Sequence, residues 1–136
     1  MSLIVMTDAG VGQILQCYFA ATDLWLRLYT NQPSLNRNTT FGDFTEATSG
    51  GYESIGLSAG DWVYEGDNDP VYVSYAEQTF TFSGGLEGDA SIYGWYITEN
   101  GVVVCMKELA SPVTPTTPGD NLKITPILYA SGGIPI

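Results

Sequence analysis

Three carboxylates stand close together in the segment YEGDNDP, at Glu65, Asp67 and Asp69. Carboxylate oxygens on a loop are ligands that Ca²⁺ prefers. The EF-hand pattern is not met, because a loop counted from Asp61 places Tyr72 at its twelfth position, where that motif needs Glu. Asp, Asn and Gly are also ordinary turn residues. We therefore interpret the segment as a solvated hairpin loop, with a calcium site as the alternative.

The chain lacks most of the residues that other kinds of catalytic site need. The chain contains no histidine, which removes the commonest general base, the commonest zinc ligand and any triad built on imidazole. A glycosidase needs two carboxylates across a sugar-sized cleft, yet the 15 acidic residues are spread along the expected loops. The Gly-rich pieces TSGGYES and SGGLEGD lack the lysine of a phosphate-binding loop. We expect a protein that is not an enzyme and holds no cofactor.

Charge restricts the possible partners. The 136 residues include 15 acidic and 4 basic side chains, for a net charge of −11. Nucleic acids and anionic membrane surfaces are bound through Lys and Arg, so neither is expected as a partner. The chain shows no signal-peptide pattern and no apolar run long enough to span a membrane. Cys17 and Cys105 are expected to be buried free thiols, with a disulfide between them as the alternative.

Aromatic residues are the stronger lead to function. In the segment LWLRLYTNQ, Trp25, Arg27 and Tyr29 share one face of an expected strand, opposite three leucines. Strands that are bulky on both faces are buried between layers or face a partner. We interpret Arg27 as a residue at a seam between sheets or subunits, with an ordinary intramolecular ion pair as the competing interpretation. The candidate interface residues are Leu3, Ile4, Val5, Trp25, Arg27, Tyr29, Trp62, Tyr64 and Tyr72.

These residues must be positioned by the elements around them, and the first of these is a helix. Apolar residues recur at helical spacing over residues 8–20, and Asp8 is placed to cap the first turn. The apolar residues at this spacing are Val11, Ile14, Leu15, Tyr18 and Phe19. The run SLIVM precedes them, and an exposed apolar terminus is expected to insert into a neighbour. We therefore expect residues 1–20 to form an arm or short helix.

The rest of the chain follows a period of two, which is typical of strands. Asn100-Gly101 separates two strand-like runs and is the dipeptide favoured in type I′ hairpin turns. Strands are expected at 24–30, 51–57, 62–64, 71–75, 77–83, 91–98, 102–108 and 121–130.

Short strands separated by Gly, Pro and Asx, with no helices between them, favour an all-β fold. We expect a jelly-roll-like antiparallel β-sandwich of about eight strands with a short N-terminal helix or arm. The whole chain, 1–136, is expected to form a single domain, with the arm or helix at 1–20 and the sandwich at 21–136.

Several segments together resemble a family of small β-sandwich proteins encoded among the virion genes of tailed phages. Members carry a stretch like L-x-L-Y-T-N, then D-[FY]-T-E-A near a G-G-Y turn, then [VI]-Y-G-[YW]-Y-[VI]-T, and finally G-D-x-L-x-I-T-P. The counterparts in this chain are Leu26 to Asn31, Asp43 to Ala47, Gly50 to Tyr52, Ile92 to Thr98 and Gly119 to Pro126. These are signatures of fold and turns, and none of them is catalytic.

The resemblance implies a virion structural protein, most simply a capsid decoration (cement) protein on the outer surface of the phage head, made in the host cytoplasm. Such a protein binds the major capsid protein or other virion subunits across capsomer boundaries, and a homotrimer suits local threefold positions. Three alternatives stay open. They are an adhesion or carbohydrate-binding module of the tail or baseplate, with Trp62 stacking on host sugars, a carboxylate-based glycosidase, and a self-assembling tail or neck subunit.

Overall fold

The computed structural model describes residues 7–65 and 71–130. Over these residues the chain forms one α-helix, nine strands and two short 3-10 helices. Its contacts gather into two compact units: unit 1 is drawn from residues 1–23, 58–77 and 125–136, and unit 2 from 24–57 and 78–124. The predicted all-β, sandwich-like class with a short N-terminal helix is confirmed. The single domain over 1–136 stays a prediction, and each unit is described by itself.

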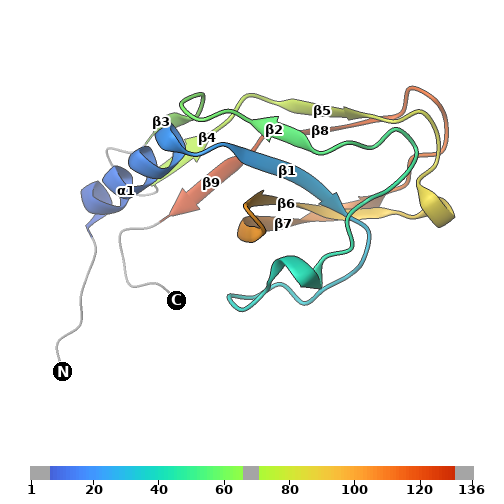
Figure 1. Cartoon of the computed structure of the whole chain (residues 1–136), viewed down its shortest axis with the longest axis horizontal. Helices are drawn as coiled ribbons and strands as arrows, with labels where there is room; N and C mark the ends of the chain where they lie inside the picture. The colour runs from blue at the N-terminus through green and yellow to red at the C-terminus, as the bar shows by residue number, and fades with distance from the viewer. Residues whose placement is uncertain (1–6, 66–70, 131–136) are drawn as a thin grey trace. The chain divides into compact units, whose positions relative to one another are not determined.

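Unit 2 is built on two antiparallel sheets, which supply the two layers of a sandwich (Figure 1). The larger sheet has the order β2-β1-β6-β7, and the smaller one pairs β5 with β8. Strand β1 is central because it pairs with β2 along one edge and with β6 along the other. The strands are β1 (Leu24–Tyr29), β2 (Ile55–Leu57), β5 (Gln78–Thr81), β6 (Ile92–Glu99), β7 (Val102–Val113) and β8 (Asn121–Ile124).

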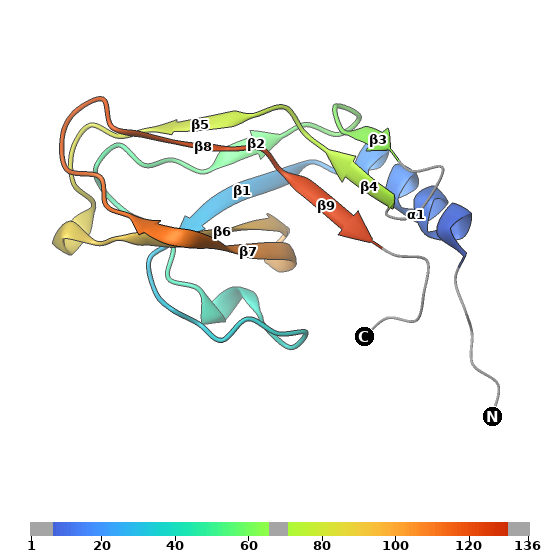
Figure 2. The ribbon, with the colours of Figure 1, turned by 180° about the vertical axis from the view of Figure 1, so that it is seen from behind.

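Both faces of the larger sheet are covered within unit 2. The three leucines of β1 are fully buried, and the smaller sheet lies on one side of the larger sheet in both ribbon views (Figures 1 and 2). On the other side run residues 30–46, whose Phe44 stacks on Tyr96 with ring centroids 4.2 Å apart. Tyr29 belongs to the same cluster and is 1% exposed. Burial between layers therefore accounts for the three leucines and Tyr29 of β1, but not for Trp25, which is 45% exposed.

The expected hairpin is confirmed. Strands β6 and β7 pair antiparallel up to Glu99 and Val102. Between these two residues Asn100 and Gly101 have φ values of 51° and 80°, the positive pair that a type I′ turn requires. Strand β7 runs to Val113, beyond the predicted end at 108, with irregular register along its pairing with β6. The turn fixes the start of the pairing, and bulges absorb the extra residues of β7.

Unit 1 combines the helix with the sheet β3-β4-β9. The elements are α1 (Asp8–Ala21), β3 (Val63–Glu65), β4 (Val71–Ser74) and β9 (Ile127–Ala130). The predicted cap at Asp8 is wrong, because Thr7 is the N-cap residue and its hydroxyl accepts from the Gly10 N–H at 3.0 Å. The helix packs against β4, where Val73 is buried, whereas Ile14 of the predicted apolar stripe is 56% exposed.

The predicted strand 121–130 is divided into two strands that belong to different units. β8 ends at Ile124 and pairs with β5 in unit 2, whereas β9 begins at Ile127 and pairs with β4 in unit 1. Between them lies Pro126, which has no N–H to donate to a ladder. The predicted strand 51–57 is likewise shorter, because pairing begins only at Ile55.

Gly94 is expected to tolerate no side chain. It lies directly opposite Tyr29, and a Cβ atom there would overlap the Tyr29 hydroxyl and the Lys107 carbonyl oxygen. Gly94→Ala should lower the free energy of unfolding by about 1–3 kcal/mol, the usual cost of overpacking. Urea denaturation followed by circular dichroism measures this. Gly84→Ala is the matched control, because a Cβ there has no atom within 4 Å, and equal stability of the two variants would contradict the assignment.

Gly12 is expected to be required for the approach of the helix to β3. A Cβ at this position would overlap the Tyr64 hydroxyl. Helix propensity alone predicts that Gly12→Ala stabilises by about 1 kcal/mol, whereas the overlap predicts a lower melting temperature. Gln13→Ala, on an exposed position of the same helix, is the control and should leave the melting temperature nearly unchanged. A rise in melting temperature for Gly12→Ala would contradict the close approach.

Candidate functional site

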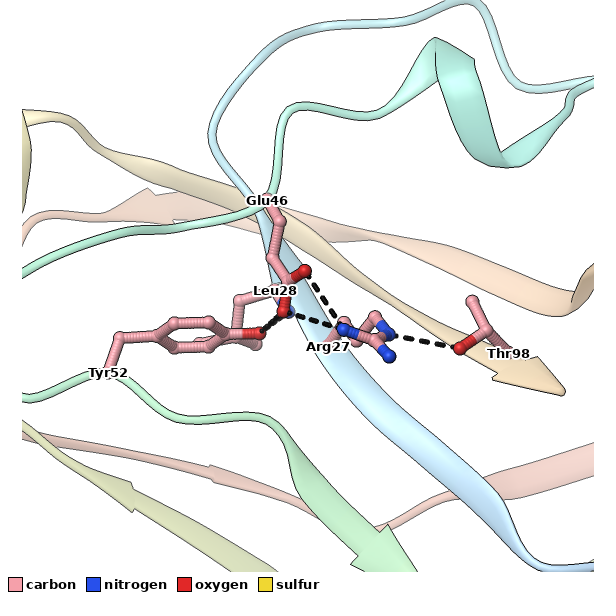
Figure 3. Close-up of polar contacts among 5 residues, drawn as sticks. All are labelled: Arg27, Leu28, Glu46, Tyr52 and Thr98. Atoms are coloured by element: carbon pink, nitrogen blue, oxygen red, sulfur yellow. Dashed lines mark hydrogen bonds and ion pairs between the residues drawn. The ribbon is translucent and has the colours of Figure 1, made fainter. Parts of the chain in front are cut away.

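Arg27 lies at the centre of a polar network on β1 (Figure 3). Its Nη1 donates to both carboxylate oxygens of Glu46, at 3.0 and 3.2 Å, and its Nε donates to Thr98 Oγ1 at 3.0 Å. The guanidinium carbon lies 5.7 Å from the centre of the Phe41 ring. The Arg27 side chain is 23% exposed and that of Glu46 28%. The only basic residue of β1 is thus held by a carboxylate of its own chain.

Tyr52 completes this network and fills a gap in strand pairing. Its hydroxyl donates to Glu46 Oε2 at 2.6 Å and accepts from the Leu28 N–H at 3.1 Å. Strand β1 pairs with β2 only as far as Leu26. Beyond Leu28, β1 bonds to residues 45–47 instead, through the Ala47 N–H to the Leu28 carbonyl and the Thr30 N–H to the Thr45 carbonyl. Tyr52 therefore accepts the hydrogen bond of the one β1 N–H that lies between the residues paired with β2 and those bonded to residues 45–47.

The network keeps nearby phenols protonated. Burial, followed by the hydrogen bond to Glu46, raises the pKa of Tyr52 well above its usual value of 10.0. Burial also raises the pKa of Tyr96 to about 12, with the Glu46 charge acting in the same direction and Arg27 opposing it. The pKa of Tyr29 rises to about 12, first by burial and then through Glu108. At neutral pH these three phenols are therefore protonated, and the Tyr52 hydroxyl can donate to Glu46.

The geometry separates the three candidate residues of β1. For Arg27 it shows the intramolecular ion pair with Glu46, which was the competing interpretation and ties β1 to the segment 45–47. The hydrogen bond from Arg27 to Thr98 ties β1 to β6. Tyr29 is buried, so its ring has no area to offer a partner. Trp25 is still a candidate for contact with a partner, because it is 45% exposed. Its ring lies beside Gly56 of β2, where an added Cβ atom would be 3.5 Å from the nearest ring atom of Trp25.

The three candidate interface residues of unit 1, Trp62, Tyr64 and Tyr72, lie in different environments. Trp62 packs between Phe19 and Tyr75, with ring centroids 4.7 and 5.1 Å away, and its indole nitrogen is buried without a hydrogen-bond partner among the described residues. Trp62 is therefore a packing residue and not an open platform for a sugar. Tyr64 lies against the helix at Gly12. Tyr72 is half-buried on the opposite side of the same sheet.

The remaining candidates include residues outside the described ranges. Leu3, Ile4 and Val5 lie outside them, as do Asp67 and Asp69 of the calcium alternative, whereas Glu65 is exposed at the end of β3. Among the residues that the structure describes, no three His, Cys, Asp or Glu side chains are grouped to hold a metal ion. The described helix is too short to cross a membrane.

The two cysteines are not paired. Cys17 is exposed on α1, so the expectation that both thiols are buried is wrong for this residue, because the apolar positions of the helix do not all face the sheet. Cys105 on β7 is partly buried. Burial raises the pKa of its thiol to about 12, against a smaller lowering by a backbone hydrogen bond from Ile97.

Sequence reasoning missed Glu46 as the partner of Arg27 and Tyr52 as the partner of Glu46. Both residues lie in FTEATSGGY, a signature of fold and turns, and nothing local in this segment indicates that it meets β1. It also missed Val63 and Tyr129, which expose 54% and 64% of their surface. Alternation within strands as short as β3 and β9 gives each residue a face but does not say which face a helix will cover.

Comparison of the chain with known protein families, curated proteins and solved structures finds no match.

The ion pair between Arg27 and Glu46 is expected to stabilise unit 2. Glu46→Gln leaves a partly buried guanidinium without its charge partner and should lower the free energy of unfolding by about 1–3 kcal/mol. A double-mutant cycle with Arg27→Met should give a coupling of about 0.5–3 kcal/mol, measured by urea denaturation. Glu53→Gln, at an exposed position of unit 2, is the control. If the losses of stability in the two single variants simply add in the double variant, the ion pair does not stabilise the fold and the prediction is wrong.

Stability is expected to fall at alkaline pH. Folded Tyr29 and Tyr96 keep their protons to about pH 12, and Tyr52 keeps its proton still higher, whereas unfolded phenols ionise near 10.0. The unfolded chain therefore loses protons first, and the free energy of unfolding decreases as pH rises above 10. Melting temperatures between pH 9 and 12 measure this. Tyr52→Phe should give a shallower slope than Tyr129→Phe, and identical slopes would contradict the role of Tyr52.

Proposed function

We propose that the protein is a non-enzymatic structural protein of a tailed-phage virion, most specifically a decoration (cement) protein on the outer surface of the head. It binds the major capsid protein across capsomer boundaries as a homotrimer and makes or breaks no covalent bond. Its work is to add contact area to a shell that is under pressure from packaged DNA.

One observation carries the proposal: the segments that resemble the phage family meet in one network. Arg27 lies in the L-x-L-Y-T-N stretch, Glu46 in D-F-T-E-A, Tyr52 in G-G-Y and Thr98 in the Y-G-W-Y-I-T stretch. Residues far apart in sequence thus satisfy one another through charge-assisted hydrogen bonds. The resembling segments build the body of unit 2, as expected for a signature of fold rather than of catalysis.

The closing segment of the resemblance acts in the same way. Gly119 has a φ of 94°, and the Asp120 carboxylate accepts from the backbone N–H groups of Thr116 and Thr117 at 2.9 and 3.0 Å. These bonds lower the pKa of Asp120. The G-D pair therefore closes a turn that leads into β8, where Ile124 is buried. The resembling segments bond to one another within the chain. Contacts with a partner are therefore made by the exposed apolar side chains elsewhere on this acidic protein.

Light scattering and binding to heads test this function. The isolated protein should have a mass near three times the 14.6 kDa of one chain. After incubation with undecorated heads, it should sediment with them and raise the temperature at which they release DNA. Heads that gain neither mass nor heat resistance would exclude a cement role.

A tail or baseplate module that binds carbohydrate is the second candidate, and Trp25 is the observation that favours it. Trp25 is 45% exposed, its indole lies beside Gly56 of the neighbouring strand, and exposed indole rings can stack on sugars. Glycan-array binding that is lost in Trp25→Ala and kept in Trp62→Phe would support this candidate over the cement role. A Trp62→Phe change keeps an aromatic ring between Phe19 and Tyr75.

A further inference from the structure

The sheet of unit 1 has one face that the helix does not cover. Directly opposite residues of paired strands share a face, so the pairings place Val63, Ser74 and Ile127 in one row and Glu65, Tyr72 and Tyr129 in the next. Tyr64, Val73 and Leu128 form the row between these two, on the opposite face, where α1 packs. We call the first two rows the helix-free face.

The helix-free face is apolar and aromatic for a surface. Val63 and Tyr129 expose more than half of their area, and Ile127 exposes 38%. Tyr72 and Tyr129 lie side by side with ring centroids 5.3 Å apart. Large apolar side chains gathered on one sheet face, and not scattered singly, are typical of a surface that meets a partner.

Charge identifies the partner. All four basic residues of the chain, Arg27, Arg37, Lys107 and Lys123, belong to unit 2. Unit 1 therefore has no Lys or Arg, while its sequence carries seven acidic residues: Asp8, Asp23, Asp61, Glu65, Asp67, Asp69 and Glu77. Glu65 lies on the helix-free face itself, directly opposite Tyr72. A second copy docked through the same face of its own unit 1 would bring like charges together, and an anionic lipid surface or nucleic acid would be repelled.

We propose that the helix-free face of unit 1 docks a protein surface that presents Lys or Arg around an aliphatic centre. The two tyrosines and the aliphatic side chains provide the desolvated middle of the contact. Glu65 and the net negative charge of unit 1 select a basic rim on the partner. This inference rests on the proposed function to the extent that the natural partner is a capsid subunit, and it names the part of the chain that such a subunit meets.

Binding to undecorated heads and to a synthetic probe tests the inference. The probe is a peptide of about 12 residues that alternates Leu and Lys, compared with one that alternates Leu and Glu. The intact chain should bind heads and the Leu-Lys peptide but not the Leu-Glu peptide. Salt near 0.5 M should weaken both interactions because it shortens the Debye length to about 4 Å.

Matched variants separate the two units. Tyr129→Ser and Glu65→Lys should weaken binding to heads and to the Leu-Lys peptide by about tenfold or more. Val102→Ser removes a side chain of unit 2 that is 61% exposed, and Glu53→Lys reverses an exposed charge of unit 2, so both are controls and should stay near wild type. Circular dichroism confirms that each variant is folded, and a melting temperature near that of wild type is expected because the changed side chains are exposed.

The outcomes distinguish this inference from the proposed function. Head binding that survives Tyr129→Ser and Glu65→Lys overturns the docking face and leaves the cement role standing. If heads are not bound at all, the cement role fails, and the Leu-Lys peptide alone decides the inference: selective binding lost in Tyr129→Ser supports it, and equal or absent binding of both peptides overturns it. Dissociation of the oligomer in Tyr129→Ser would show that the face joins copies of this chain, which also overturns the proposal.

Discussion

The ion pair between Arg27 and Glu46 is the interaction on which the arrangement of unit 2 depends. A guanidinium that is 23% exposed at the centre of a strand needs a counter-charge and hydrogen-bond acceptors close by, since a partly buried charge without them is costly. The requirement is met by a carboxylate from the segment that follows the long connection after β1 and by a hydroxyl from β6. Satisfying one side chain therefore sets the position of three segments at once.

Strand β1 shows how this constraint is combined with ordinary sheet pairing. Its first half bonds to β2 and its second half to residues 45–47, so its partner changes within a single edge. The Tyr52 hydroxyl occupies the place of the change, where it serves the Leu28 N–H and the Glu46 carboxylate together. Burial and hydrogen bonding hold this phenol in its protonated form, which is the form that donates to the carboxylate.

Charge is divided unequally along the chain, and the division follows the two units rather than the order of residues. Unit 2 is discontinuous in sequence yet contains every basic residue of the chain. One of these, Arg27, forms an ion pair with Glu46 of the same unit. Unit 1 has acidic and apolar side chains but no cation of its own from Lys or Arg. The docking that we propose for the helix-free face would discriminate between partners by repulsion of anions as much as by attraction of cations. This gives the proposed virion role a specific surface to act through.

The sequence by itself determined the features that depend on neighbouring residues. Period-two alternation placed the leucines of β1 on one face, and Asn100-Gly101 specified the hairpin between β6 and β7. The absence of helical patterns after residue 20 indicated an all-β fold. Each of these signals depends on local dihedral preferences or on the pleat of a strand, so no distant contact is needed to interpret it.

Only the tertiary structure decided which distant segments meet. Glu46 as the partner of Arg27, the burial of Tyr29 beside Phe44, and the assignment of β8 and β9 to different units all depend on pairings between residues far apart in the chain. Trp25 and Tyr29 occupy equivalent positions of one strand face, yet one is exposed and the other buried. The physical reason is that alternation gives a residue its face, whereas the layer that covers the face comes from elsewhere in the chain.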